Sequence, residues 1–367
     1  MDIDKLDLQI DPVLPRRKDF RIGCIGSGFI MNDCHLVAYR NAGFNPYAIA
    51  SRTESKARAA ADRHGIEHTH ADWQTLVADP QIEILDIAFP PDQQLEIVEQ
   101  AVQNRSIRGI LCQKPMAMNY GEAARIVDLC AKAGVKLAVN SNMRYDQSMR
   151  ALKTILEQGY LGTPVLATIE MRAIPHWQDF LKKYRHLEIL NMGIHHLDIL
   201  RYLFGEPEKI TALTRRDPRT QFDHIDGISQ YTFQYANELM ATSLDDVWAW
   251  PGEGTEKDIY IKWRVEGTDG MAHGTIGWPT YPDRTPSTLA CTSKCFSNHW
   301  FKPQWDSVWF PDAFAGTMAQ LLRAVEDDCE PEISGRDNLR TMAAVDACYA
   351  SIESGKTISF AERIKSI

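Results

Sequence analysis

The order of apolar and polar segments predicts an α/β protein with two domains. Short apolar runs alternate with helical runs from residue 19 to residue 141, which is typical of a parallel, doubly wound sheet with helices on both faces. From about residue 208 to residue 298 the apolar period is mostly two, which predicts a C-terminal α+β domain with a large, mostly antiparallel open sheet. The length of 367 residues also exceeds one ordinary core, so two domains are expected.

The first domain is organised around residues 21–31, a buried strand that turns directly into a helix. Arg21-Ile22-Gly23-Cys24-Ile25 is short and apolar, as in a central parallel strand, and Gly26-Ser27-Gly28 follows without a spacer. A turn this tight needs residues without a Cβ, which also let a pyrophosphate approach the backbone and the positive end of the helix. Met31 replaces the third glycine of G-x-G-x-x-G, so the turn alone is weak evidence. A second strand at residues 46–51 supplies the context of a dinucleotide-binding Rossmann domain.

The remaining elements follow in order, with glycines ending helices and prolines ending strands. In the first domain we expect strands at residues 84–89, 109–113 and 136–140, and helices at 53–64, 92–104 and 120–133. Beyond it we expect a strand at 163–172 and helices at 147–158, 188–204, 312–326 and 338–354. The expected domains are a flexible arm at 1–18, a Rossmann domain at 19–142, a substrate-binding and oligomerisation domain at 143–330, and a C-terminal helix and tail at 331–367.

Composition and charge argue against several kinds of partner. The net charge is −9 without a run of like charges, so nucleic acid and anionic membranes are poor partners. No apolar stretch is long enough to span a bilayer, and the polar N-terminus lacks the apolar region of a signal peptide, which favours a cytoplasmic location. His64, His68 and His70 straddle a helix end and a loop without a carboxylate at ligand spacing, so we interpret them as a solvated connection and expect no metal site.

Two motifs stand out: Gln113-Lys114-Pro115, and residues 191–198, Asn-Met-Gly-Ile-His-His-Leu-Asp. At these two places the sequence resembles the Gfo/Idh/MocA family of nicotinamide-dependent sugar and cyclitol oxidoreductases. The Gly-rich turn, Asn142-Met143-Arg144-Tyr145 and residues 334–357 extend the resemblance over almost the whole chain. The resemblance implies a C-terminal open sheet that often forms the oligomer interface, so we expect a homodimer or homotetramer through that sheet.

Lys114 matches the family's catalytic lysine, and its position supports that role independently. It follows the carboxyl end of a parallel strand, where open α/β sheets bind their ligands. Partial burial there would lower its pKa, and its ammonium could hold a substrate hydroxyl. The alternative is an ordinary solvated lysine in a loop, but the strand before Lys114 and Pro115 after it favour the catalytic interpretation.

His195 matches the family's acid–base histidine. Asn191 and His195 are four residues apart on the expected helix and share a face, whereas His196 points away and is interpreted as packing. An imidazole titrates near neutrality and can take a hydroxyl proton as hydride leaves the same carbon. An isolated histidine would more often be structural, but Asn191 and the matched motif favour catalysis.

Two positions depart from the family pattern. Asn191 stands where Asp is common, and an amide can hydrogen-bond a substrate hydroxyl but carries no charge to raise the basicity of the histidine. Gln94 stands where many members have a histidine. Both departures leave the substrate open.

The choice of cofactor depends on the end of the second strand. NAD-binding proteins usually have Asp or Glu there, whereas NADP-binding proteins avoid that charge and offer an arginine. This chain has Ser51 and Arg52, with Lys56 one turn on, which favours NADP over NAD; an exposed arginine at a strand end is the alternative. The expected cofactor contacts are Gly26, Ser27, Gly28, Phe29, Ile30, Ser51, Arg52, Lys56, Pro90, Gln113 and Lys114.

A basic, aromatic segment leads into the helix of His195 and suggests an acidic substrate. Arg172 and Arg185 are expected to contact a carboxylate, sulfonate or phosphate, because arginine forks suit planar anions. Lys182 and Lys183 are better explained as solvating a surface helix. The expected substrate contacts are Arg144, Tyr145, Arg172, Trp177, Arg185, Asn191 and His195.

Seven of the nine tryptophans lie between residues 248 and 309. We interpret them as filling sheet faces or a subunit contact; the alternative is that one or two stack on a sugar ring.

Together these features predict an NAD(P)-dependent oxidoreductase that acts on a secondary alcohol of a sugar, cyclitol or sugar acid. His195 would be the acid–base, Lys114 would orient the hydroxyl and Asn191 would contact the substrate. Two alternatives remain: a glycoside hydrolase that oxidises the sugar transiently and returns the hydride, and a non-catalytic regulator that only binds the dinucleotide.

Overall fold

The computed structural model describes residues 6–173, 179–247, 258–279, 282–295 and 299–366, which form two compact units. The unit called here the Rossmann unit consists of Asp11–Tyr145 and Phe310–Met342. The other, the open-sheet unit, consists of Met1–Ile10, Asp146–Trp309 and Ala343–Ile367. Each is described below by itself.

The Rossmann unit contains the predicted parallel sheet, which has six strands. Its strands are β1 (Arg21–Ile25), β2 (Asn45–Ala50), β3 (His68–His70), β4 (Ile84–Ile87), β5 (Gly109–Cys112) and β6 (Lys136–Val139). They lie in the order β3-β2-β1-β4-β5-β6, so the direction of winding reverses between β1 and β4. This order belongs to dinucleotide-binding folds, whose ligands bind beyond the carboxyl ends of the strands at that reversal.

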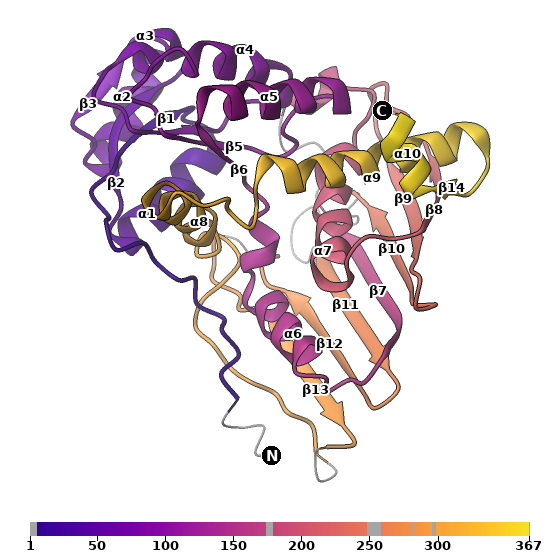
Figure 1. Ribbon diagram of the computed structural model, residues 1–367. Helices are drawn as coiled ribbons and strands as arrows, with labels where there is room; N and C mark the ends of the chain where they lie inside the picture. Colours follow the sequence, from indigo (N-terminus) through magenta and orange to yellow (C-terminus); the bar gives the residue numbers. More distant parts are fainter. Residues whose placement is uncertain (1–5, 174–178, 248–257, 280–281, 296–298, 367) are drawn as a thin grey trace. The chain divides into compact units, whose positions relative to one another are not determined.

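Helices cover both faces of this sheet (Figure 1). α3 (Trp73–Ala78), α4 (Pro91–Ala101) and α5 (Tyr120–Ala133) lie on one face. On the other face are α1 (Leu36–Ala42), α2 (Glu54–His64) and α8 (Phe314–Asp327). β4 and β5 are buried along their whole length and β1 at every residue after Arg21, which explains why these strands are mostly apolar; the buried Asp86 in β4 is an exception.

The chain divides elsewhere than the sequence predicts. The segment that carries α8 was expected in the second domain, but it groups with the Rossmann unit. Gly109 in β5 explains the close packing, because a Cβ at this residue would lie 2.8 Å from a methyl of Val325 and 3.0 Å from one of Leu321. The expected connection at His68 and His70 is also corrected, since both residues lie in the edge strand β3.

The open-sheet unit contains an eight-stranded sheet in the order β13-β12-β11-β7-β10-β9-β8-β14. The strands are β7 (Pro164–Arg172), β8 (Lys209–Arg215), β9 (Ile228–Gln234), β10 (Met240–Asp246), β11 (Tyr260–Gly267), β12 (Gly270–Ile276), β13 (Thr288–Ser293) and β14 (Ile358–Ser359). Only the β7–β10 pair among these is parallel, so the prediction of a mostly antiparallel sheet is confirmed.

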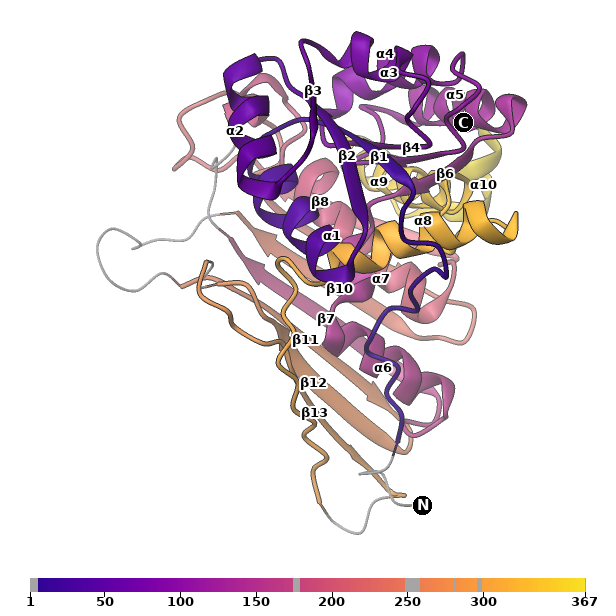
Figure 2. The same cartoon turned by 90° about the vertical axis from the view of Figure 1, so that its left-hand side faces the viewer.

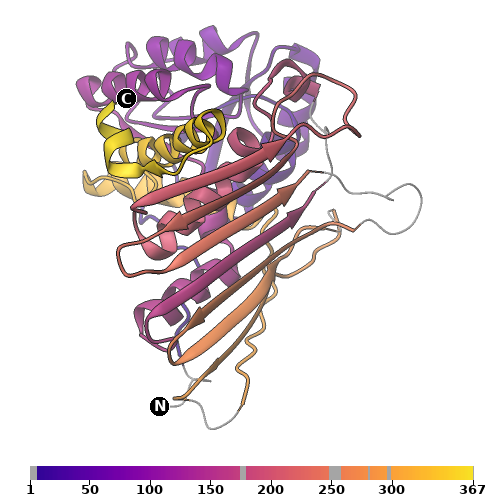
Figure 3. The same ribbon diagram turned by 90° about the vertical axis from the view of Figure 1, so that its right-hand side faces the viewer.

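One face of this sheet is covered by α6 (Gln147–Glu157) and α7 (Ile194–Phe204), as Figure 2 shows. In Figure 3 the opposite face is turned to the viewer, and none of the described helices lies across it. Burial alternates along β8, β9 and β10, as expected for strands with one covered face. α9 (Gly335–Ser354) passes from one unit into the other, and α10 (Phe360–Ser366) ends the described chain. None of the helices within the described ranges is long and apolar enough to cross a membrane.

Candidate active site

The Gly-rich turn at the end of β1 requires glycine at one position and leaves space at another. Gly26 has a φ of +113°, its N–H donates to the carbonyl of Ala50 at 2.8 Å, and a Cβ would lie 2.8 Å from the oxygen of Ala88. At Gly28 no atom lies within 4 Å of the position that a Cβ would occupy. This open backbone at the carboxyl edge of the sheet fits the pyrophosphate of a dinucleotide.

The helix that follows the turn begins as a π-helix, Ile30–His35, and continues as α1. Phe29 is the residue before its first turn, and the N–H of Asn32 donates to the carbonyl of Gly28 at 2.8 Å. The N-terminal N–H groups and positive dipole end of such a helix favour an anion. The turn, Phe29 and Ile30 thus lie where the sequence expects the pyrophosphate contacts.

The end of β2 contains no acidic side chain. The hydroxyl of Ser27 donates to that of Ser51 at 2.8 Å, which ties the turn to the second strand. Ser51 is buried, whereas Arg52 and Lys56 are exposed. The side chains at this strand end thus include an exposed arginine and an exposed lysine, and the choice between NAD and NADP stays a prediction.

Lys114 follows β5 and lies in a loop that two glutamines brace. Its backbone N–H donates to Oε1 of Gln113 at 2.9 Å. The buried amide of Gln94 donates to the carbonyls of Gln113 and Pro115 and accepts from the N–H of Gln113, each at 2.9 Å. Gln94, a departure from the family pattern, therefore holds the peptide on both sides of Lys114.

The surroundings of Lys114 make its ammonium unusually acidic. Part of the side chain remains accessible, but burial lowers the pKa of Lys114 from 10.5 to about 7. A lysine that titrates near neutrality at the carboxyl edge of a parallel sheet can hold or release a proton there. This property of Lys114 agrees with the sequence-based expectation.

In the open-sheet unit, His195 is buried near the start of α7, with an exposed fraction of 5%. The indole of Trp309 meets its imidazole edge to face, with ring centres 5.7 Å apart. The ring of Trp278 packs similarly on Trp309 at 6.3 Å. The sequence did not single out these two tryptophans, because their residues lie more than 80 positions from His195; only the clustering of tryptophans hinted at them.

A cluster of buried acids, formed by Glu188, Asp226 and Asp245, lies behind the start of α7. Asp245 Oδ1 lies 2.9 Å from Nδ1 of His196, so His196 belongs to a buried polar network rather than to simple packing. The hydroxyl of Tyr231 donates to Asp245 Oδ2 at 2.7 Å. Burial, followed by the nearby charges of Asp245 and Asp226, raises the pKa of Glu188 well above its ordinary value.

Asn191 lies in a second π-helix, Ile189–Gly193, directly before α7. The carbonyl of Glu188 accepts from the N–H groups of Asn191, Met192 and Gly193 at 3.2, 2.8 and 2.9 Å. The expected single α-helix over residues 188–204 is therefore corrected to a π-helix followed by an α-helix. The argument from regular four-residue spacing between Asn191 and His195 does not apply across this junction.

The arginines expected at the substrate have carboxylate neighbours. Arg172 lies 2.8 Å from Asp246, and the exposed Arg185 lies 3.1 Å from the exposed Asp223. Arg144 is buried in the Rossmann unit and lies 2.6 Å from Asp337, while Tyr145, also buried, packs near Gly316. Trp177 lies outside the described residues. The substrate roles of these residues remain predictions.

The structure thus brings together the expected cofactor contacts and Lys114 in the Rossmann unit. Asn191, His195, Arg172 and Arg185 belong to the open-sheet unit.

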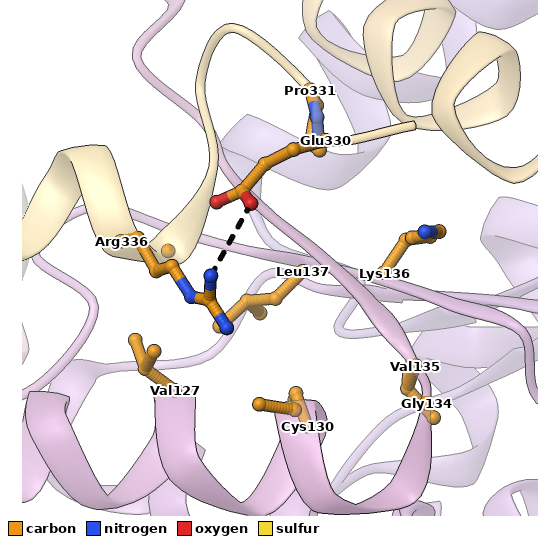
Figure 4. Close-up of a pocket in the computed structure, with 11 residues that line it drawn as sticks. Val127, Cys130, Gly134, Val135, Lys136, Leu137, Glu330, Pro331 and Arg336 are labelled. Atoms are coloured by element: carbon orange, nitrogen blue, oxygen red, sulfur yellow. Dashed lines mark ion pairs between the residues drawn. The ribbon is translucent and has the colours of Figure 1, made fainter. Parts of the chain in front are cut away.

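Figure 4 shows a cavity of about 210 Å³ in the Rossmann unit. This cavity is not at the carboxyl edge of the parallel sheet. Lys136, the first residue of β6, and the ion pair of Arg336 with Glu330 at 3.7 Å are among its lining. It therefore lies at the amino ends of the strands, whereas Lys114 follows a carboxyl end. A larger cavity, of about 510 Å³, lies in the open-sheet unit beside Trp300 and Trp305. In the parts of the chain that the structure describes, no three His, Cys, Asp or Glu side chains are arranged so that they could hold a metal ion.

Comparison with known proteins agrees with this geometry. Residues 20–141 match the family model described as an oxidoreductase family with an NAD-binding Rossmann fold, and residues 149–273 match the GFO/IDH/MocA C-terminal domain. A D-apiose dehydrogenase from Paraburkholderia graminis is 28% identical over 347 residues, which cover 93% of this chain and 90% of that protein. A D-xylose 1-dehydrogenase (NADP⁺) from Haloferax volcanii is 24% identical over 342 residues, which cover 92% and 98%.

Solved structures show the same relationship. An oxidoreductase from Agrobacterium radiobacter, solved with NAD⁺, L-tartaric acid and magnesium, is 25% identical with a TM-score of 0.79, and the match covers 94% of this chain and 99% of that one. The fold, the Gly-rich turn, the lysine after β5 and both family models therefore lead to one conclusion: the chain belongs to the Gfo/Idh/MocA family of oxidoreductases.

Proposed function

We propose that the protein transfers a hydride between the nicotinamide of NAD or NADP and a secondary alcohol or ketone of a sugar, cyclitol or sugar acid. The observation that carries this proposal is Lys114, a desolvated lysine whose pKa is about 7 at the carboxyl edge of the same sheet as the dinucleotide turn. The relatives named as dehydrogenases of apiose and xylose support the substrate class.

In this proposal three side chains transfer the proton, orient the reacting oxygen and bind the substrate. In the oxidative direction His195 takes the proton of the substrate hydroxyl, and in the reductive direction it returns that proton to the oxygen of the ketone. Lys114 donates a hydrogen bond to the same oxygen and orients it, and Asn191 binds a neighbouring hydroxyl. The nicotinamide, when bound, accepts or supplies the hydride.

The test is a panel of sugars, cyclitols, sugar acids and glycosides, assayed together for reduced cofactor and for released aglycone. On the best substrate, Lys114→Ala and His195→Ala should each lower kcat about 10²-fold or more, with cofactor affinity nearly unchanged. Lys183→Ala, which alters an exposed lysine, is the control and should keep wild-type turnover. A Lys114→Ala or His195→Ala enzyme as active as this control would remove that residue from the mechanism.

The same panel separates the alternatives. Aglycone release without net reduction of the cofactor would identify a glycoside hydrolase that recycles its hydride. Cofactor binding without turnover of any compound would favour a non-catalytic regulator, although retention of both Lys114 and His195 argues against that alternative.

Within this function we propose NADP as the preferred cofactor, with Arg52 binding the 2′-phosphate. Support comes from the exposed Arg52 and Lys56 and from the absence of an acid at the end of β2. Titration of both cofactors should show tighter NADP binding in the wild type and a loss of that preference in Arg52→Ala. Equal affinities in the wild type, or tighter NAD, would exclude the proposal.

We also propose that the substrate carries an acidic group that Arg172 or Arg185 contacts. The exposed ion pair of Arg185 with Asp223 is of a kind that contributes little stability, so its guanidinium can exchange partners at small cost. The relative solved with L-tartaric acid supports the inclusion of hydroxy acids in the panel. An acidic sugar should be preferred over its neutral counterpart in the wild type and less so in Arg185→Ala, with Lys182→Ala as the control. Preference for the neutral sugar would contradict this proposal.

Finally, we propose that a second copy of the chain covers the uncovered face of the eight-stranded sheet. Leu213, Met240 and Leu244 are exposed on alternating positions of β8 and β10. Exposed apolar side chains on an open sheet are typical of a subunit contact.

A further inference from the structure

A chain of hydrogen-bonded polar side chains, most of them buried, runs through the Rossmann unit from the peptide of Lys114, and no local sequence pattern indicates it. Oε1 of Gln113 accepts from the backbone N–H of Lys114 at 2.9 Å and from Nδ2 of Asn140 at 3.3 Å. The same Nδ2 lies 3.0 Å from Nε2 of His35. These contacts connect Lys114 to the last residue of the π-helix that begins at the dinucleotide turn.

The chain continues beyond His35 to a buried carboxylate. Nδ1 of His35 lies 2.7 Å from Oδ2 of Asp86 in β4, and the hydroxyl of Tyr39 in α1 donates to the same oxygen at 2.7 Å. Asp86, Asn140 and Tyr39 are fully buried, and His35 is 1% exposed. Polar groups at this depth are costly unless their hydrogen bonds are made, so their orientations are tightly restricted.

The donors and acceptors along this chain of side chains can be assigned from one group that can only donate. The N–H of Lys114 can only donate, so Gln113 must present Oε1, and Asn140 must then present Nδ2 to Gln113. Because that Nδ2 also faces Nε2 of His35, Nε2 must accept. The single proton of the imidazole is therefore on Nδ1, where it is donated to Asp86.

We propose that His35 is a positioning residue for Lys114: its neutral imidazole, protonated at Nδ1, holds the lysine peptide in place through Asn140 and Gln113. His35 thereby couples the helix that follows the dinucleotide turn to the loop of the proposed catalytic lysine. The imidazole also packs against Phe314 of α8, with ring centres 5.1 Å apart, which restricts its rotation. The expected effect on turnover rests on the proposed catalytic role of Lys114, whereas the expected effect on the lysine itself does not.

Three variants separate positioning from general support of the core. His35→Phe keeps an aromatic ring but removes the acceptor that faces Asn140. His35→Gln returns an acceptor near the position of Nε2 and is the conservative rescue. Tyr39→Phe is the matched control: it removes the hydroxyl that donates to Asp86 and lies 3.0 Å from Nδ1 of His35, but it leaves the contact of Nε2 with Asn140 that leads to Lys114.

The primary measurement is competitive acetylation of Lys114 in the full-length protein against pH, read by mass spectrometry without substrate. In the wild type the labelling midpoint should lie at about 7. In His35→Phe the loosened loop should hydrate the amine, so the midpoint moves towards 10.5. On a substrate found with the panel, kcat of His35→Phe should fall about 10- to 100-fold with cofactor affinity unchanged. His35→Gln and Tyr39→Phe should stay close to the wild type in both measurements.

The proposal is overturned if folded His35→Phe keeps the wild-type midpoint, or if Tyr39→Phe shifts the midpoint as far as His35→Phe does. If His35→Phe does not fold, Asn140→Asp tests the same link, because it places an acceptor against Oε1 of Gln113. The same upward shift is then expected, and an unchanged midpoint overturns the proposal. Since acetylation needs no substrate, an enzyme that turns over nothing would contradict the proposed function while leaving this result standing.

Discussion

At Lys114, the burial that lowers the pKa of the amine works against stability. The pKa of Lys114 is about 7 in the folded protein, against 10.5 for an exposed lysine. Between these values the unfolded chain binds a proton that the folded chain lacks, so this residue makes stability rise with pH. Below about pH 7 the full cost of desolvating the ammonium is present.

Replacing Lys114 by methionine should therefore lower the activity and raise the stability of the protein. Lys114→Met keeps the volume without the charge, so it should unfold at a higher temperature than the wild type at about pH 6, and the difference should shrink towards about pH 10. Thermal unfolding across that range measures it, with the exposed Lys183→Met as the control. A Lys114→Met protein less stable than the wild type at acidic pH would show that the lysine is not desolvated.

At the residue scale, the sequence identifies candidate site residues that belong to a motif, but it does not identify the partners that distant segments bring to them. Lys114 and His195 were predicted because local patterns mark them, and their roles stay predictions until they are tested. Trp309 against His195, and His35 behind Lys114, were not predicted, because each contact joins residues far apart in the chain. From the sequence, Gln94 was noted only as a departure from the family pattern, although its amide hydrogen-bonds the peptide on both sides of Lys114.

At the element scale, the buried strands were predicted well because burial on both faces demands apolar residues. β1 and α5 have the expected bounds, and β2, β4, β5 and β6 differ by one or two residues. The two π-helices were missed, since an apolar helix face looks almost the same with one residue inserted. Both interrupt a regular helix next to candidate site residues, the dinucleotide turn in one case and His195 in the other.

Glu188 directly precedes the second π-helix, and its ionisation makes the stability of the protein depend on pH. The pKa of Glu188 is raised well above 4.5, first by burial and then by Asp245 and Asp226. From pH 4.5 up to its raised pKa, the folded protein binds a proton that the unfolded chain has lost, so this residue makes stability fall as pH rises.

Glu188→Gln keeps the shape without the ionisable group and should remove this contribution. The variant should gain stability relative to the wild type as pH rises above 4.5, measured as unfolding midpoints in urea across the pH range. Glu67→Gln, which changes an 84% exposed side chain, is the control and should follow the wild type. Parallel curves for Glu188→Gln and the wild type would mean that folding does not raise the pKa of Glu188.

At the scale of the whole molecule, the sequence predicts both sheets but not which segments complete each unit. α8 joins the Rossmann unit although it begins about 20 residues after β13 of the open sheet, because its side chains fill the space over Gly109. Such a return of the chain leaves no local pattern. The uncovered sheet face, in contrast, can be inferred from alternation along the strands, and it leads to a prediction about assembly.

Leu244 on β10 lies opposite Gln230 on β9, which lies opposite Leu213 on β8, so the two leucines belong to one surface of three adjacent strands. A charge placed there would be desolvated in a subunit contact but harmless in a monomer. Leu244→Asp should therefore lower the mass measured by light scattering from a multiple of 41.6 kDa to 41.6 kDa. Leu14→Asp is the matched control, because Leu14 is 38% exposed, like Leu244 at 37%, but lies outside the sheet; its assembly should not change. A monomeric wild type, or a Leu244→Asp protein that keeps its mass, would show that this face is not where copies of the chain meet.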